Sequence, residues 1–316
     1  MSDVILGGPL RDSRLRRVVL GRDVSGKRLT DPREEDLARL DHYATAAGLS
    51  FVSGERYGTD PDGGAAALDL VMAEVIMGAF GHVSAGTLAE RRGMIRARAA
   101  SRLAASEGVP ADVRSATTAD TIDVRSREVL HEGFYAMRGF DLRHPTFGGG
   151  MSDRVRREVF IATDAALVLP YDPVRDRVLL VEQFRMGPFG RGDPRPWMLE
   201  PVAGRVDPGE TPEHAARREA REEANLDLRY VEPMSSHYCS PGCSTEYFHL
   251  FIGLCDLPDE AEGRGGLETE HEDIRTHVLD FEGAMRLLDT GEADNGPLIL
   301  SLLWLARNRD RLRAIC

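Results

Sequence analysis

The segment from Gly204 to Leu226, which we call the box, constrains the fold of this 316-residue chain more than any other. A glycine turn and Glu210 precede Arg218, after which acidic residues recur at helical spacing: Glu219, Glu222 and Glu223. Side chains three and four positions apart are neighbours on a helix. Neighbouring carboxylates repel one another unless a cation lies among them. The spacing therefore predicts a site for a hard divalent cation such as Mg²⁺, which takes oxygen ligands.

Local signals predict that the box folds as a loop, a helix and a second loop. Thr211 suits the N-cap and Pro212 the first helical position, where a missing N–H costs nothing. Asn225 suits the left-handed residue that ends many helices. An apolar face follows at four-residue spacing: Ala216, Ala220 and Ala224.

The alternative interpretation of the box is a solvated helix face. Runs of Glu and Arg usually form i,i+4 pairs in water, and Arg218 can reach Glu222 in this way. The complete spacing from Gly204 through Glu210 to Glu223 favours the metal site over this alternative.

The box resembles the signature of the Nudix hydrolases, which cleave nucleoside diphosphates linked to another group. The similarity extends from about Arg125 to the C-terminus and is closest to the ADP-ribose pyrophosphatase branch. It implies an α/β/α sandwich with a mixed sheet for residues 121–316, and Mg²⁺ as cofactor with Mn²⁺ as an alternative. The family has Gly near the end of the box, where this chain has Asn225.

The residues around the box agree with an α/β fold. The continuous apolar run Ala165–Pro170 predicts a buried strand, a turn is predicted over Tyr171–Asp176, and Val178–Arg185 is predicted as the next strand. The stretch Trp197–Ala203 predicts a strand that leads into the box. The apolar run Pro297–Arg307 predicts a helix that covers the core.

The resemblance also implies the roles of individual residues. The metal ligands would be the carbonyl of Ala203 and three carboxylates: Glu219, Glu223 and Glu272. The catalytic residues would be Glu270 as general base, with Glu222 and Arg218. The substrate-binding residues would be Phe134, Arg157, Arg185 and Glu200.

Two of these residues would act across a dimer. By resemblance, Phe134 stacks on adenine and Arg157 lies in the same nucleotide pocket, both reaching it from the other subunit, whereas Arg185 contacts phosphate. The alternatives are strand packing for Phe134 and an ordinary surface position for Arg157. A proline at position 241 resembles a marker of the ADP-ribose hydrolases, although Pro-Gly is also a common turn.

These features predict an enzyme that hydrolyses ADP-ribose or a related ADP-sugar to AMP and a sugar phosphate, with a nucleotide sugar as its ligand and a homodimer as its assembly. Two alternatives stay open. The substrate could be another nucleoside diphosphate derivative, or the chain could be a non-catalytic module that senses ADP-ribose. A panel of substrates with Mg²⁺ would separate the three.

Residues 1–120 predict a mainly helical N-terminal region, with helices over 64–106 and a linker from 110 to 120. The motif Leu6–Leu10 and the later Tyr43 resemble a gamma-glutamylcyclotransferase-like domain, fused to a Nudix domain as in tellurite-resistance-type proteins. The family's catalytic glutamate is replaced by Ala44, so we interpret the segment as degenerate. A P-loop over residues 21–27 is rejected, because Arg28 offers no hydroxyl to a metal.

Composition narrows the class of partner. A net charge of −12 argues against binding nucleic acid through phosphate contacts. We also expect no membrane partner, because no apolar run reaches the length of a span. The four cysteines (Cys239, Cys243, Cys255 and Cys316) are too few for a disulfide framework, and a zinc site is disfavoured. We therefore expect a cytoplasmic protein.

Overall fold

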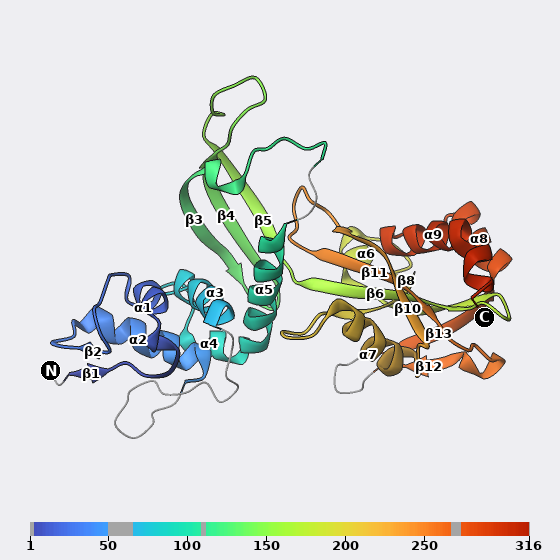
Figure 1. The fold of residues 1–316 in the computed structure, drawn as a ribbon, viewed down its shortest axis with the longest axis horizontal. Coiled ribbons are helices and arrows are strands. Elements are labelled where there is room, and N and C mark those ends of the chain that lie inside the picture. The colour runs from blue at the N-terminus through green and yellow to red at the C-terminus, as the bar shows by residue number, and fades with distance from the viewer. Residues whose placement is uncertain (1–2, 50–65, 109–111, 267–272, 316) are drawn as a thin grey trace. The chain divides into compact units, whose positions relative to one another are not determined.

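The computed structural model describes residues 3–49, 66–108, 112–266 and 273–315, and Figure 1 shows the course of the chain. Its contacts divide into two compact units. The first holds residues 1–163 and 242–245, and the second holds residues 164–241 and 246–316. Strands between residues 123 and 161 thus group with the N-terminal helices, whereas the predicted domain boundary lies near residue 120.

The first unit is helical over most of the chain before residue 105. Its helices are α1 (Ser13–Leu20), α2 (Glu34–Ala47), α3 (Ala66–Gly78), α4 (Ala85–Glu90) and α5 (Arg92–Ala104). Two short strands, β1 (Val4–Ile5) and β2 (Arg28–Leu29), pair with each other. Buried leucine and isoleucine side chains, among them Leu10, Leu40 and Ile95, form its core. The predicted helices within 64–106 are confirmed.

A three-stranded antiparallel sheet completes the first unit. Its strands are β3 (Asp123–Glu132), β4 (Ala136–Arg143) and β5 (Val155–Ile161), in that order. Most side chains of β3 are exposed to solvent, while Val129 packs against the helical core. The sheet is therefore attached to the helices at one end.

The second unit is built on an eight-stranded mixed sheet. Its strands are β6 (Asp164–Asp172), β7 (Arg177–Phe184), β8 (Trp197–Glu200), β9 (Val202–Arg205), β10 (Tyr230–Tyr238), β11 (Tyr247–Leu254), β12 (Gly263–Gly265) and β13 (Ile274–Asp280). The main order is β10-β11-β6-β7-β13-β12, with β8 beside β7 and β9 beside β6. Strands β11 and β6 are parallel and the other pairs are antiparallel.

Helices cover both faces of this sheet, as Figure 1 shows. They are α6 (Met186–Arg191), α7 (Pro212–Ala224), α8 (Phe281–Thr290) and α9 (Gly296–Arg313). Because successive strand residues face opposite sides, Val168 packs in the core under α7 while Leu169 packs in the core under α8 and α9. The predicted α/β/α sandwich with a mixed sheet is confirmed.

The predicted strands and helices differ from the observed ones mainly in where they begin and end. The predicted strand Trp197–Ala203 is two strands, because Pro201 lacks an N–H and interrupts the ladder. The first half pairs with β7 and the second with β6. The C-terminal helix begins at Gly296, with Pro297 in its first turn as predicted, and continues to Arg313. Among the described residues, the helices are all too short or too polar to cross a membrane.

A buried carboxylate joins two segments of the first unit. Asp36, in the first turn of α2, is 0% exposed. It accepts a hydrogen bond from Arg22 Nη2 at 2.7 Å and another from Arg33 Nη2 at 2.8 Å. Hydrogen bonds from Arg22 and then Arg33 outweigh the opposing effect of burial and hold the pKa of Asp36 well below its ordinary value.

Replacing Asp36 with Asn should reduce the acid sensitivity of the protein. A lowered folded-state pKa stabilises the fold above the ordinary value of 3.8, and that contribution is lost as pH falls through the lowered pKa. We expect D36N to cost about 1 to 3 kcal/mol near neutral pH and less on acidification. Denaturant unfolding followed by circular dichroism at several pH values measures this. D23N is the control, because Asp23 pairs with Arg17 at the surface, where their side chains are 82% and 70% exposed. Equal losses of unfolding free energy in D36N and D23N would contradict the prediction.

Candidate metal and catalytic site

The caps of α7 fix where the box helix begins and ends. The Oγ1 of Thr211 accepts a hydrogen bond from the N–H of His214 at 3.2 Å, and Pro212 opens the helix. Asn225 ends it in the left-handed conformation, with φ 52° and ψ 39°. The predicted loop–helix–loop is thus confirmed at both ends, and Ala216 and Ala220 are fully buried as predicted.

The guanidinium of Arg218 lies among three carboxylates. Its Nε donates to Glu210 Oε1 at 3.2 Å, and its Nη1 donates to Glu219 Oε1 at 2.6 Å and to Glu222 Oε2 at 2.9 Å. The hydrogen bond that Arg218 donates to Glu210 is the largest cause that raises the pKa of Arg218. Burial alone would raise the pKa of Glu210, but the bond from Arg218 lowers it. One positive charge therefore holds three negative ones together.

Two glutamates of α7 lie against strand β9. Glu223 is 1% exposed, and its Oε2 accepts a hydrogen bond from the N–H of Ala203 at 3.0 Å. Since the N–H and C=O of one residue in an antiparallel strand point to the same edge, the carbonyl of Ala203 lies on the edge of β9 that carries this bond, away from β6. Glu219 lies against Gly204, where an added Cβ would be 1.8 Å from Glu219 Oε1. The absence of a side chain at Gly204 thus makes room for Glu219.

The acidic loop predicted to be catalytic begins beside the same helix end. A Cβ at Gly265, the last residue of β12, would lie 1.6 Å from the carbonyl oxygen of Glu223. The N–H of Gly266 donates to the carbonyl of Glu222 at 3.3 Å. The predicted general base Glu270 and the predicted ligand Glu272 themselves lie outside the described residues.

The donor set of the box suits a divalent metal. Carboxylate oxygens from Glu219, Glu222 and Glu223 lie on one helix, and Glu223 binds the N–H of Ala203 on the adjacent strand. Hard cations prefer such oxygen ligands, and the space that Gly204 leaves open admits the carboxylate of Glu219 to the backbone of β9. Within the residues that the structure describes, however, no three His, Cys, Asp or Glu side chains cluster closely enough to form a metal site by themselves. Arg218 lies among the carboxylates instead.

Arg185 and Glu200 form a second charged group in the same unit. Arg185 follows β7, Glu200 ends the adjacent β8, and their Nε and Oε2 atoms are 2.7 Å apart. Burial is the main cause that raises the pKa of Glu200, and the opposing effect of Arg185 does not cancel it. The side chain of Arg185 is 39% exposed although its Nε is paired with Glu200.

Phe134 and Arg157 belong to the first unit, while the box belongs to the second. The side chain of Phe134 is 60% exposed, and its ring meets that of Tyr135 edge-on at 5.0 Å. Arg157 lies on β5, and its Nη1 donates to the carbonyl of Arg156 at 2.9 Å. The strand-packing alternative for Phe134 is thus not what the structure shows, because most of the residue is open to solvent.

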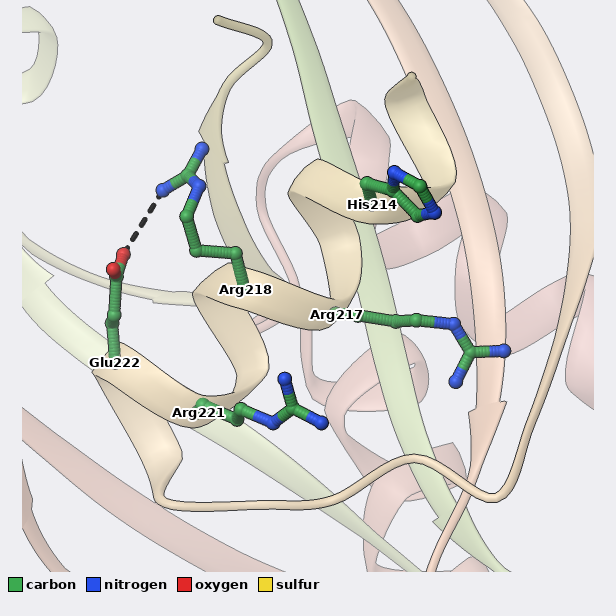
Figure 2. Close-up of a pocket in the computed structure, with 5 residues that line it drawn as sticks. All are labelled: His214, Arg217, Arg218, Arg221 and Glu222. Carbon is green, nitrogen blue, oxygen red and sulfur yellow. Dashed lines mark hydrogen bonds and ion pairs between the residues drawn. The ribbon is translucent and has the colours of Figure 1, made fainter. Parts of the chain in front are cut away.

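An open pocket of about 290 Å³ runs along the outer side of α7. Its lining residues are His214, Arg217, Arg218, Arg221 and Glu222. Figure 2 shows Arg218 directed toward Glu222, while Arg217 and Arg221 extend away from that pair. Arg217 donates to Glu213 and Arg221 to Asp227, so part of this positive charge is already neutralised. The pocket thus joins the carboxylate cluster to a basic helix face.

The sequence did not assign a role to Glu210 or to Gly265. Glu210 is an immediate partner of Arg218, but it lies in the loop before the helix, where helical spacing gives no signal. Gly265 is required by a close approach between segments far apart in the chain. The only signal in the sequence for this close approach is the glycine itself, which stands just before an acidic loop.

A profile described as the NUDIX domain matches residues 162–302 of the chain. The ADP-ribose pyrophosphatase of Escherichia coli strain K12 is 40% identical over 192 residues, which cover 61% of this chain and 91% of that protein. The chain therefore belongs to the NUDIX family. The ADP-ribose pyrophosphatase of Haemophilus influenzae is 39% identical over 194 residues, covering 61% of this chain and 89% of the relative.

Other similarities are more distant. The GDP-mannose pyrophosphatase of Salmonella paratyphi B is 33% identical over 187 residues, covering 58% of this chain and 95% of that protein. Among solved structures, the crystal structure of an ADP compounds hydrolase matches 60% of this chain and 96% of its own, with 19% identity and a TM-score of 0.47.

Replacing Asn225 with Ala should destabilise the end of α7. A residue with a Cβ pays about 1 to 2 kcal/mol for left-handed backbone, and Asn tolerates it better than Ala. We therefore expect N225A to lower the melting temperature of the second unit by a few degrees, measured by the fluorescence of its tryptophans, Trp197 and Trp304. N225G, which suits a positive φ, is the control and should melt at or above the wild-type temperature. A lower melting temperature for N225G than for N225A would contradict the prediction.

Proposed function

We propose that this chain hydrolyses the pyrophosphate bond of ADP-ribose or a related ADP-sugar, giving AMP and a sugar phosphate. The observation that carries the proposal is the gathering of four glutamates of the box, Glu210, Glu219, Glu222 and Glu223, around Arg218 and strand β9. Family membership and 40% identity to an ADP-ribose pyrophosphatase support the choice of substrate.

The proposed cofactor is Mg²⁺, with Mn²⁺ as an alternative. The carbonyl of Ala203 and the carboxylates of Glu219, Glu223 and Glu272 would hold it. A divalent metal supplies charge neutralisation at the phosphates and lowers the pKa of a bound water.

Other side chains would take part in proton transfer and in substrate binding. Glu270 would take the proton of the attacking water, provided that it reaches hydrogen-bond distance in the substrate complex. Arg218 orients Glu222 and Glu219 through the bonds described above. Arg185, fixed by its bond to the half-buried Glu200, would contact phosphate. Phe134 would stack on adenine, and Arg157 would line the same pocket from the other subunit of a homodimer.

The similarity to GDP-mannose pyrophosphatases favours a second candidate, a hydrolase of another nucleoside diphosphate sugar. Its lower identity places it after ADP-ribose. A non-catalytic sensing module is disfavoured because the box keeps all of its glutamates.

The proposal extends to location. We propose that the protein is cytoplasmic, because four cysteines are too few for a disulfide framework. The cyclotransferase-like resemblance of the N-terminal region remains a prediction. With Ala44 in place of the catalytic glutamate, we assign that region no chemistry of its own.

A substrate panel tests the proposed function. Purified protein is given ADP-ribose, GDP-mannose, NAD or a nucleoside triphosphate with Mg²⁺, Mn²⁺ or a chelator, and the products are separated by chromatography. We expect AMP from ADP-ribose, with kcat/KM about tenfold or more above the other substrates, and no turnover with the chelator. Faster release of GMP from GDP-mannose would establish the second candidate, and binding without hydrolysis would establish the sensor.

Variants of the box helix provide the matched controls. E223Q preserves shape but removes the buried charge beside Ala203, so turnover should fall on the order of a hundredfold or more while the melting temperature stays close to wild type. E213Q removes an exposed glutamate of the same helix and should retain activity. Normal turnover by E223Q would show that the metal assignment is wrong.

Replacing Gly204 with Ala should separate activity from stability. The added Cβ displaces Glu219, a flexible side chain that can move at little cost to the fold, so we expect activity to fall about tenfold or more and the melting temperature to change little. G263A, at a strand glycine with no atom within 4 Å of the added Cβ, is the control. Full activity of G204A in the ADP-ribose assay would remove Glu219 from the site.

A further inference from the structure

A buried arginine of α5 binds the turn between β3 and β4. The side chain of Arg98 is 3% exposed. Its Nη1 donates to Glu132 Oε1 at 2.7 Å, and its Nη2 donates to the carbonyl oxygen of Phe134 at 2.6 Å. One guanidinium therefore contacts both the last residue of β3 and the backbone of the turn that follows.

Neighbouring groups reinforce this contact. Arg91 Nη1 donates to the carbonyl of Glu132 at 2.7 Å, and Arg138 pairs with the carboxylate of Glu132 from within the sheet. The carboxylate of Glu132 is 1% exposed. Buried charges are tolerated only when they are paired and hydrogen-bonded. Helix α5 and the turn therefore depend on each other for their positions.

The turn itself is tight and presents an exposed aromatic ring. The N–H of Gly133 donates to the carbonyl of Tyr135 at 2.7 Å. Between them, Phe134 is 60% exposed although its carbonyl is held by a buried group. A fixed backbone with an exposed ring is suited to stacking on a planar ligand, because little freedom remains to be lost on binding.

Helix α5 lies well before the matched NUDIX profile, which begins at residue 162. The described relatives cover 61% of this chain, so more than a third of it has no counterpart in them. The contact between Arg98 and the turn therefore connects the N-terminal region to a residue proposed to bind the base.

We infer that Arg98 is a positioning residue for nucleotide binding, through which the N-terminal helices hold the turn carrying Phe134 in place for a purine base. The inference rests on the proposed function, in which Phe134 stacks on adenine. It gives the N-terminal region a task in substrate recognition: Arg98 fixes the main chain of the turn, and the ring of Phe134 makes the contact with substrate.

Steady-state kinetics with ADP-ribose test this inference. R98M removes both hydrogen bonds, so we expect KM to rise about fivefold with kcat within about twofold of wild type, because stacking contributes to binding and not to chemistry. F134A should raise KM at least as much. In the double variant R98M/F134A the effect of R98M should disappear, since Arg98 acts through Phe134.

Two variants control for unfolding. R102M removes an arginine of the same helix that pairs with Glu74 away from the turn, and its KM should equal that of wild type. R98K keeps a positive charge beside Glu132 but loses the two-pronged contact, and its KM should lie between those of wild type and R98M. If R98M does not fold, the KM values of R98K, F134A and R98K/F134A are compared in the same way.

The outcomes separate this inference from the proposed function. If wild type hydrolyses ADP-ribose while R98M and R98K keep its KM, the function stands and the inference fails. Additive effects of R98M and F134A would also overturn it. If wild type does not hydrolyse ADP-ribose, calorimetric titration with AMP replaces KM, and equal affinities of wild type, R98M and R98K for AMP would again overturn it.

Discussion

Repulsion among the acidic side chains of α7 is the constraint on which the site depends. Four glutamates of the box lie close to one another, and in the structure the guanidinium of Arg218 binds three of them. The fourth, Glu223, is buried against the backbone of β9, where a hydrogen bond from Ala203 stabilises its charge. The local fold follows from this need: a glycine at 204 admits Glu219, and a glycine at 265 lets β12 approach the helix end.

Much of the second unit could be predicted from the sequence because its signals are local. Apolar runs marked β6 and β7, and Thr211, Pro212 and Asn225 marked the limits of α7. The division of the strand at Pro201 was not foreseen, because the apolar residues before Glu200 and after Pro201 were interpreted as one strand. The strands with which these two segments pair could not be predicted either. β8 pairs with β7 and β9 pairs with β6, although β8 and β9 almost touch in the sequence.

The candidate site was predictable in its residues but not in their pairing. Helical spacing placed Glu219, Glu222 and Glu223 near one another and brought Arg218 to Glu222. It could not show that Arg218 also binds Glu210 across a loop, or that Glu200 pairs with Arg185. Such contacts depend on tertiary structure, as does the grouping of β3 with helices far earlier in the chain.

The buried Glu132 has a consequence for dividing this protein into parts. A chain cut near residue 120 would keep β3 but lose α5, and so would expose a carboxylate that is 1% accessible in the intact unit. The severed strands would carry Arg138 as a remaining partner of that carboxylate, while the surface that α5 covered would face water. We therefore expect a piece that retains the three-stranded sheet to need α5 as well, since the sheet and the N-terminal helices form one compact unit.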